Sequence, residues 1–123
     1  PYTAADLDWR NSKSRSSLEM KDPASRPEMA KEPLDLSLYD TIYIGFPIWW
    51  YTAPHIILTF LENNDLAGKT IIPFATSGGS GIDGSMKDLQ KACPDAEFKA
   101  GRKMSASESL ASVQKWIGSL ELQ

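Results

Sequence analysis

The residues best suited to bind a ligand lie in two short stretches of the chain. The first contains three adjacent large aromatic residues at positions 49–51, and the second is the glycine- and serine-rich run from Thr76 to Gly81. Aromatic side chains can stack on a flat ring, and a good aromatic pair contributes about 0.5–1.5 kcal/mol beyond burial. Glycines let backbone N–H groups converge on the edge of a ligand. Together the two stretches favour a site for a flat, polar heteroaromatic ring.

A predicted strand precedes each stretch. Residues Thr41 to Phe46 and Lys69 to Ala75 are rich in apolar residues without polar alternation, which is typical of parallel strands covered on both faces. Pro47 should end the first strand, because it has no N–H to donate. Pro73 suggests a bulge or an unpaired position in the second. Since the carboxyl ends of neighbouring parallel strands lie together, the two stretches should form two walls of one cleft.

The rest of the chain alternates in the same way. Helices are predicted over 53–63, 83–92 and 107–120, a short strand over 96–99, and a loop over 101–105. Strand–helix alternation of this kind predicts a doubly wound parallel sheet with right-handed crossovers. The residues expected to face the sheet are Ile56, Ile57, Phe60 and Leu61 in the first helix, Met86 and Leu89 in the second, and Leu110, Val113, Ile117 and Leu120 in the last.

Residues 1–38 differ from the rest, because they hold four of the eight prolines. We expect an irregular arm there, with a capping box formed by Thr3 and Asp6 and a short helix over 14–21. Its anchors on the remaining residues, 39–123, should be Trp9, Leu18 and Met20. The whole chain, residues 1–123, is then expected to be a single domain.

Composition limits the possible functions. The chain has 123 residues, 41% hydrophobic and 24% charged, as in one soluble globular domain. No apolar run approaches the ~20 residues that cross a membrane, so a cytoplasmic location is the default expectation. A net charge of −3 argues against nucleic-acid binding. One cysteine, Cys93, and one histidine, His55, make a nitrogen and sulfur metal site unlikely to arise, and we expect His55 to be a surface or hydrogen-bonded residue.

Two alternatives remain open at this point. Gly79, Gly81 and Gly84 satisfy the Gly-x-Gly-x-x-Gly pattern of NAD(P)-binding domains, between a strand and a helix. That pattern normally follows the first strand of its domain, whereas here a strand and a helix precede it. The aromatic stretch could instead bind a protein partner, or simply pack on the protein itself.

The residues of both stretches also resemble a known family. A strand followed by Gly45-Phe46-Pro47-Ile48-Trp49-Trp50, and later by Thr76 to Gly81, resembles the flavodoxin family over about residues 37–120, in the subgroup with a Pro-x-Trp-Trp loop. The resemblance implies a flavodoxin-like three-layer α/β/α sandwich with a parallel sheet, FMN as cofactor, and electron transfer or FMN-dependent oxidoreduction. It implies no catalytic side chain, and its cofactor-binding residues would be Pro47, Ile48, Trp49, Trp50, Thr76, Ser77, Gly78 and Gly79.

The chain departs from the family pattern in one respect. It contains no Ser/Thr-x-Thr-Gly-x-Thr phosphate loop, so we expect an N-terminally truncated sandwich with impaired FMN binding. Three lost charge-assisted hydrogen bonds correspond to at least about three decades in affinity. The absent first strand would leave residues 41–46 as an exposed hydrophobic edge. Either the arm covers that edge or, as we favour, two chains form a homo-oligomer there. The redox partner cannot be identified from the sequence.

Overall fold

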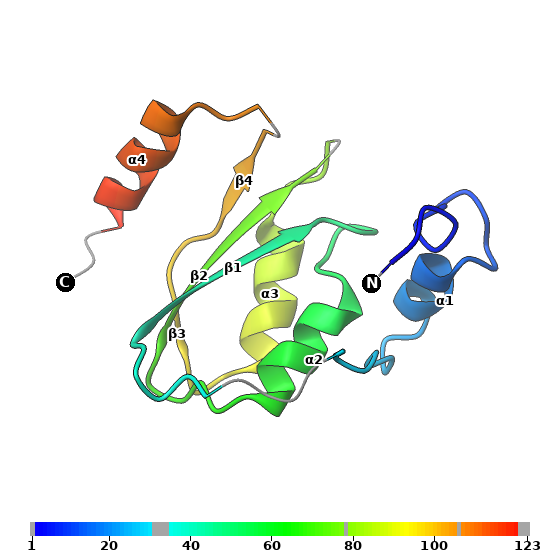
Figure 1. Cartoon of the computed structure of the whole chain (residues 1–123), viewed down its shortest axis with the longest axis horizontal. Helices are drawn as coiled ribbons and strands as arrows, with labels where there is room; N and C mark the ends of the chain where they lie inside the picture. The colour runs from blue at the N-terminus through cyan, green and yellow to red at the C-terminus, as the bar shows by residue number, and fades with distance from the viewer. Residues whose placement is uncertain (1, 31–34, 78, 106, 121–123) are drawn as a thin grey trace.

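The computed structural model describes residues 2–30, 35–77, 79–105 and 107–120, and it forms one parallel sheet with helices on both faces. β2 (Thr70–Thr76) lies between β1 (Thr41–Pro47) on one side and β3 (Glu97–Phe98) and β4 (Arg102–Met104) on the other. The helices are α1 (Arg15–Lys21), α2 (His55–Asn63), α3 (Asp83–Ala92) and α4 (Leu110–Ser119) (Figure 1). The predicted α/β fold is confirmed. No helix in this described part is long and apolar enough to cross a membrane.

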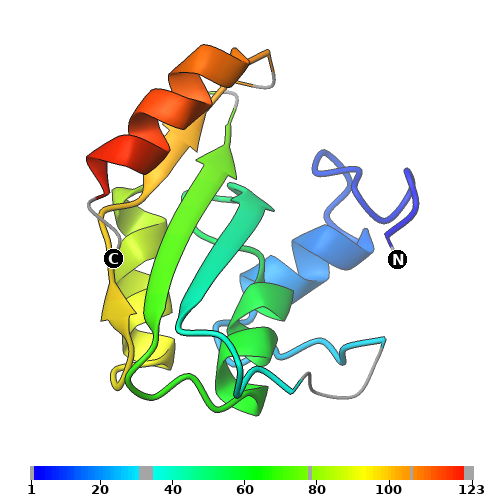
Figure 2. The ribbon, with the colours of Figure 1, turned by 60° about the vertical axis from the view of Figure 1, so that its left-hand side comes forward.

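The core lies between the sheet and the pair α2–α3. Ile44 and Phe46 of β1 and Ile71 of β2 point to this side, where they join a buried cluster with Leu61 and Leu89. Residues alternate between the two faces along a strand, so the residues of β1 and β2 that alternate with these core residues face α4. Figure 2 shows α3 and α4 on opposite sides of the sheet. The arrangement has the three layers expected of an α/β/α sandwich.

The face under α4 is less well covered than the sequence predicts. Trp116 is the buried residue of α4, and its ring lies 6.4 Å from that of Tyr43 and 6.2 Å from that of Phe74. The expectation that both faces of β1 are buried is wrong, because Tyr43 remains 43% exposed. The predicted apolar stripe of the last helix is also wrong, since Leu110 is 73% exposed. One large indole, placed between the predicted positions, makes the contact instead.

The prolines take positions where a missing N–H costs little. β1 ends at Pro47, as predicted, although Pro47 still pairs in register with Thr76. The N–H of Ile48 donates to Thr76 O at 2.9 Å, so the even positions bond β2 and Pro47 faces the free edge. Pro73 causes no bulge opposite β1. It faces the other side, at the gap between β3 and β4, where the unpaired position is as predicted.

The boundaries of most elements agree with the sequence, with three exceptions. The helix over 83–92 has the predicted bounds, but α2 begins at His55, α4 begins at Leu110 and not at 107, and β4 occupies part of the predicted loop 101–105. In α2, Leu58 and Leu61 are buried, whereas Ile56, Ile57 and Phe60 are half-buried. The expectation for His55 is wrong, because the residue is 6% exposed and its Nδ1 has no partner among the described atoms.

Residues 2–21 of the arm, which include α1, lie beyond the carboxyl end of β1 rather than along its edge (Figure 1). The predicted capping box is present: Thr3 N–H donates to Asp6 at 2.9 Å and Asp6 N–H donates to Thr3 Oγ1 at 3.1 Å, although it closes a turn and not a helix. Trp9 is 66% and Leu18 55% exposed, so their predicted role as buried anchors is wrong. Arg26 instead fastens the arm to Glu62 of α2, with an Nε–Oε1 distance of 2.9 Å. In the described residues β1 pairs only with β2.

Candidate functional site

The chain reverses sharply just after β1, in a tight turn from Trp49 to Thr52. Trp49 N–H donates to Thr52 O at 2.9 Å, and Thr52 N–H donates to Trp49 O at 3.0 Å. The two central residues both have positive φ, 45° at Trp50 and 69° at Tyr51, which is the signature of a type I′ turn. Glycine and asparagine normally fill these positions, because other residues lose about 1–2 kcal/mol each there. Two bulky aromatic residues are therefore held in a strained conformation.

Helix α3 holds this turn from one side. A Cβ at Gly84 would lie 2.5 Å from the carbonyl oxygen of Tyr51, so only glycine allows the helix to approach the turn so closely. Thr52 Oγ1 also donates a hydrogen bond to the carboxylate of Asp88 on the same helix. The strained turn is thus fixed by backbone packing and a side-chain hydrogen bond together. Its aromatic side chains point outward, since Trp50 is 45% and Tyr51 75% exposed.

The arm supports the turn from another side. The ring of Tyr2 meets that of Trp49 edge to face, with centroids 5.4 Å apart, and Arg15 lies 4.0 Å above the Tyr2 ring. Arg15 Nε also pairs with Glu19 at 2.8 Å, and the Tyr2 hydroxyl donates to the same carboxylate. Burial and then this hydrogen bond raise the pKa of the Tyr2 phenol well above its ordinary value. These contacts fix the indole of Trp49 in place.

The glycine- and serine-rich stretch begins beside the turn, as the sequence predicts. Pro47 and Thr76 are register partners at the carboxyl ends of β1 and β2, and the Ile48–Thr76 hydrogen bond extends the pairing by one residue. Beyond β2, the Gly79 N–H donates to Ser77 Oγ at 3.1 Å. The structure therefore brings the two predicted walls to the same end of the sheet. Gly78 lies outside the described residues.

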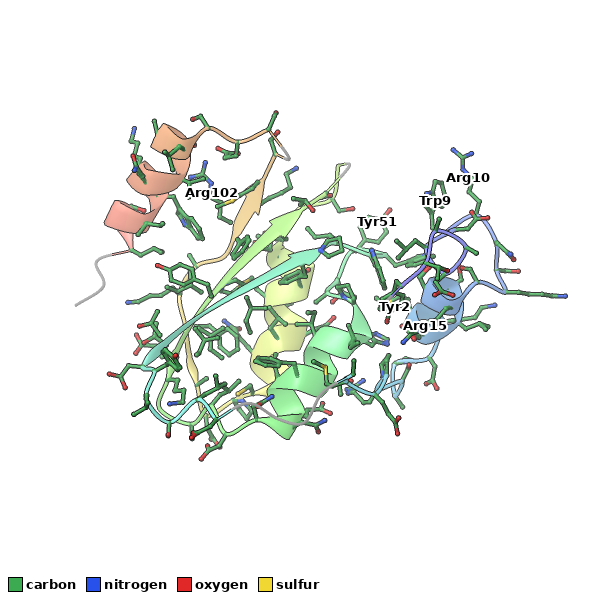
Figure 3. The ribbon with its side chains drawn as sticks, viewed as in Figure 1. Tyr2, Trp9, Arg10, Arg15, Tyr51 and Arg102 are labelled. Atoms are coloured by element: carbon green, nitrogen blue, oxygen red, sulfur yellow. The ribbon has the colours of Figure 1, made fainter. Side chains whose placement is uncertain are left out.

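A hollow of about 390 Å³ opens against these walls. Ile48, Trp49 and Trp50 are predicted site residues that line it, whereas Pro47, Thr76, Ser77 and Gly79 lie next to it without lining it. The sequence analysis missed the arm's contribution. Trp9 of the arm and Tyr51 of the turn both line the hollow, and Figure 3 shows Tyr51 at the end of the sheet that faces the arm. The lining residues not predicted for the cofactor are Leu7, Trp9, Ser16, Tyr51 and Ser80.

The chemistry of this hollow is that of a stacking site rather than of a polar catalytic centre. Its lining contains four aromatic side chains and no acidic or basic residue. Among the described residues no group of three or more His, Cys, Asp or Glu side chains could hold a metal ion. The hollow is therefore suited to a flat ring, with serine hydroxyls at its border.

The glycines of the Gly-x-Gly-x-x-Gly pattern have no common function in the structure. A Cβ would meet nothing within 4 Å at Gly79 or Gly81, so neither position needs glycine for a close approach. Gly84 is needed, but the contact it permits is with Tyr51. The pattern therefore has a packing explanation at its last position, and it follows the second strand of the observed sheet.

Comparison with known proteins identifies the family to which this chain belongs. The flavodoxin family model matches residues 1–120, so the match includes the arm. The crystal structure of a "Putative flavoprotein" from Bacteroides uniformis has a TM-score of 0.90 and 53% identity, covering 95% of this chain and 74% of that one. A protein of the same description from Bacteroides eggerthii has a TM-score of 0.87 and 44% identity, covering 100% and 77%. No match is found among curated proteins. The chain belongs to the flavodoxin family.

Proposed function

We propose that the chain binds FMN by its ring system and takes part in electron transfer. The observation that carries this proposal is the strained aromatic turn, because it places Trp49 and Trp50 along a hollow of about 390 Å³ in a member of the flavodoxin family. Strain of this kind persists only where the surrounding structure enforces it, and it is concentrated at functional sites. A flavin-binding role gives the strained residues Trp50 and Tyr51 a reason to expose their rings.

The residues present fit the ring of a flavin. Pro47, Ile48, Trp49 and Trp50 form the aromatic wall, and stacking there would supply most of the binding energy. In this proposal Thr76, Ser77, Gly78 and Gly79 would supply the second wall, at the carboxyl end of β2 next to Ser80 of the hollow, because backbone N–H groups suit the polar edge of the ring. A bound flavin supplies the oxidation–reduction chemistry itself, while the protein positions it, excludes water and adjusts its potential. We assign no catalytic side chain.

We also propose that the 123-residue chain binds FMN weakly. Its sequence contains no phosphate loop, and the hollow is lined by no basic residue. FMN and riboflavin share the ring and differ in the phosphate. If the ring provides nearly all of the contacts, the two compounds should have dissociation constants within about threefold of each other, in the micromolar range.

Calorimetric titration with riboflavin and FMN tests this proposal. Trp49→Leu should weaken riboflavin binding by at least about tenfold, because a stacking partner worth about 1–1.5 kcal/mol and part of the wall are lost. Tyr39→Leu is the matched control, since it removes an exposed aromatic residue that precedes β1. Equal loss in both variants, or no riboflavin binding by the unmodified chain, would contradict the proposed site. FMN binding a hundredfold tighter than riboflavin would contradict the weak-phosphate proposal.

A second proposal concerns association. The outer edge of β1 has no strand beside it in the described residues, and Tyr43 on the same strand is 43% exposed. Such an edge invites pairing with another chain. We propose a homo-oligomer through residues 41–46. Sedimentation at micromolar concentration should show a dimer, whereas a monomer with rapidly exchanging amides in β1 would contradict this. A cytoplasmic location stays a prediction.

One observation favours an alternative function. Trp50 and Tyr51 are exposed side by side, and exposed aromatic pairs are common at protein interfaces. A partner protein could therefore cover the turn in place of a flavin. Under this alternative, riboflavin would not bind and the Trp49→Leu variant would have no measurable effect on any flavin titration.

A further inference from the structure

A second hollow lies against the arm and shares Trp9 and Trp50 with the 390 Å³ hollow proposed for the flavin, which is called the cofactor hollow below. It has a volume of about 290 Å³, and its lining residues are Trp9, Arg10, Ser12, Ser17, Met20, Lys21 and Trp50. Both indoles line both hollows, so the two are contiguous. The remaining lining residues come only from the arm, and none of them lines the cofactor hollow.

The chemistry of this second hollow differs from that of the first. Two indoles and the thioether of Met20 offer a soft apolar surface that suits an aromatic ring. Arg10 and Lys21 add two positive charges, and no lining residue is acidic. Among the described residues neither cation has an ion pair with a carboxylate, in contrast to Arg15 and Arg26 of the same arm. The two free cations therefore suit an anionic group.

One of the two cations, Arg10, is also held near a ring. The guanidinium carbon of Arg10 lies 5.1 Å from the centre of the Trp9 ring, a cation–π contact that keeps the charge at the border of the hollow. Figure 3 shows Trp9 and Arg10 together on the arm, beside the end of the sheet that carries Tyr51. Ser12 and Ser17 supply hydroxyl donors in addition. An apolar ring surface with a positive border is complementary to a flat ring that carries a negative substituent.

We propose that this second hollow binds a small aromatic carboxylate. Its volume is at the lower end of the range for small-molecule sites, so one or two fused rings should fit. The binding itself is independent of the flavin and can be measured without it.

The test compares 2-naphthoate with the neutral 2-naphthalenemethanol by calorimetric titration of the full chain. The carboxylate should bind about tenfold more tightly than the alcohol. Arg10→Gln and Lys21→Gln should each weaken 2-naphthoate binding by about three- to fivefold, as for exposed charge pairs, and leave the alcohol unchanged. Trp9→Leu should weaken both compounds. Lys13→Gln is the matched control, because it removes one arm charge outside the hollow.

The outcomes separate this inference from the proposed function. Trp49 lines only the cofactor hollow, so Trp49→Leu should weaken riboflavin and leave 2-naphthoate unchanged. Equal affinity for carboxylate and alcohol, or an equal loss in Lys13→Gln, would overturn the inference. So would a loss of 2-naphthoate binding in Trp49→Leu, since the compound would then occupy the cofactor hollow. Failure of riboflavin to bind would contradict the proposed function but not the carboxylate site.

Discussion

Two tight turns at opposite ends of the sheet show how differently this chain treats backbone strain. At the amino end, the turn before β2 places Gly68 at a φ of 75°, where glycine has no steric cost. At the carboxyl end, the turn after β1 places Trp50 and Tyr51 at positive φ, where bulky side chains are disfavoured. Positive φ is therefore adopted in one turn by glycine, for which it has no steric cost, and in the other by two bulky aromatic residues, for which its steric cost is high.

The difference follows the functional polarity of a parallel sheet. Ligands bind at the carboxyl ends of the strands, whereas the opposite end only has to connect the elements. A Cβ at Gly68 would meet nothing within 4 Å, so that turn is free of tight packing. The aromatic turn is instead held by α3 and by Tyr2 of the arm. We interpret the strain at Trp50 and Tyr51 as the consequence of a binding surface that must present two aromatic rings.

The largest effect should come from the packing of α3 on the aromatic turn. Gly84→Ala would place a methyl group 2.5 Å from the Tyr51 carbonyl oxygen and should lower the free energy of unfolding by about 1–3 kcal/mol. It should also weaken riboflavin binding, because the turn must move. Gly81→Ala is the control, since nothing lies within 4 Å of its Cβ position. Chemical denaturation of both variants gives the comparison, and equal stability would contradict the close approach.

The second-largest effect on stability should come from a substitution in the turn at Gly68. Gly68→Ala forces a side chain to a φ of 75° and should cost about 1–2 kcal/mol of stability. Riboflavin affinity should not change, because this turn is at the other end of the sheet. The expected pair of results is a lower denaturation midpoint with an unaltered titration curve. A weakened titration curve would mean that the two ends of the sheet are coupled.

A glycine substitution in the aromatic turn should raise the stability of the protein instead of lowering it. Tyr51→Gly relieves strain at a φ of 69° and loses little packing, because Tyr51 is 75% exposed. Relief of about 1–2 kcal/mol exceeds the extra entropy of glycine, so we expect a net gain of about 0.5–1 kcal/mol in stability. Flavin affinity should fall in the same variant. Denaturation and riboflavin titration of one preparation measure both changes, and a less stable variant would show that the turn is not strained.

The smallest effect should be a pH dependence of stability that involves the aromatic turn and not the turn at Gly68. The Tyr2 phenol is held in its neutral form, since burial and the bond to Glu19 raise its pKa. A raised pKa means that the contribution of this contact to stability is complete below about pH 10, the unfolded value, and is lost as pH rises toward the folded value. Trp49 should therefore become more accessible to quenchers above pH 10. Tyr2→Phe should remove this dependence, and an unchanged alkaline profile in that variant would contradict the assignment.

The parts of the fold that follow from local patterns could be predicted from the sequence. The β-branched runs predicted β1 and β2, and the bounds of α3 follow from its apolar spacing. The burial of α4 could not be predicted, because periodicity favoured Leu110 and Ile117 while the available space above Tyr43 and Phe74 suited Trp116. β1 does end at Pro47, but the sequence could not show that the missing N–H costs no hydrogen bond to β2, because that depends on which edge of the strand the residue faces.

The candidate site divides in the same way. The positions of the aromatic and glycine-rich stretches follow from where their strands end, so their placement at the same end of the sheet could be predicted. The contribution of the arm could not, since Trp9 and Ser16 are far from Trp49 in the sequence and share no motif with it. The positive φ angles of Trp50 and Tyr51 also have no signal in residue type, because neither residue favours that conformation.

The most direct test of the account is an amide and indole chemical-shift map of the ¹⁵N-labelled chain during titration with riboflavin. The account predicts that the largest changes occur at the indole N–H groups of Trp49 and Trp50 and at the amide of Ser77, with no change at Gly68. Changes concentrated at the Gly68 turn, or an aromatic turn that remains unaffected at saturation, would contradict the claim that the strained turn is the flavin-binding surface.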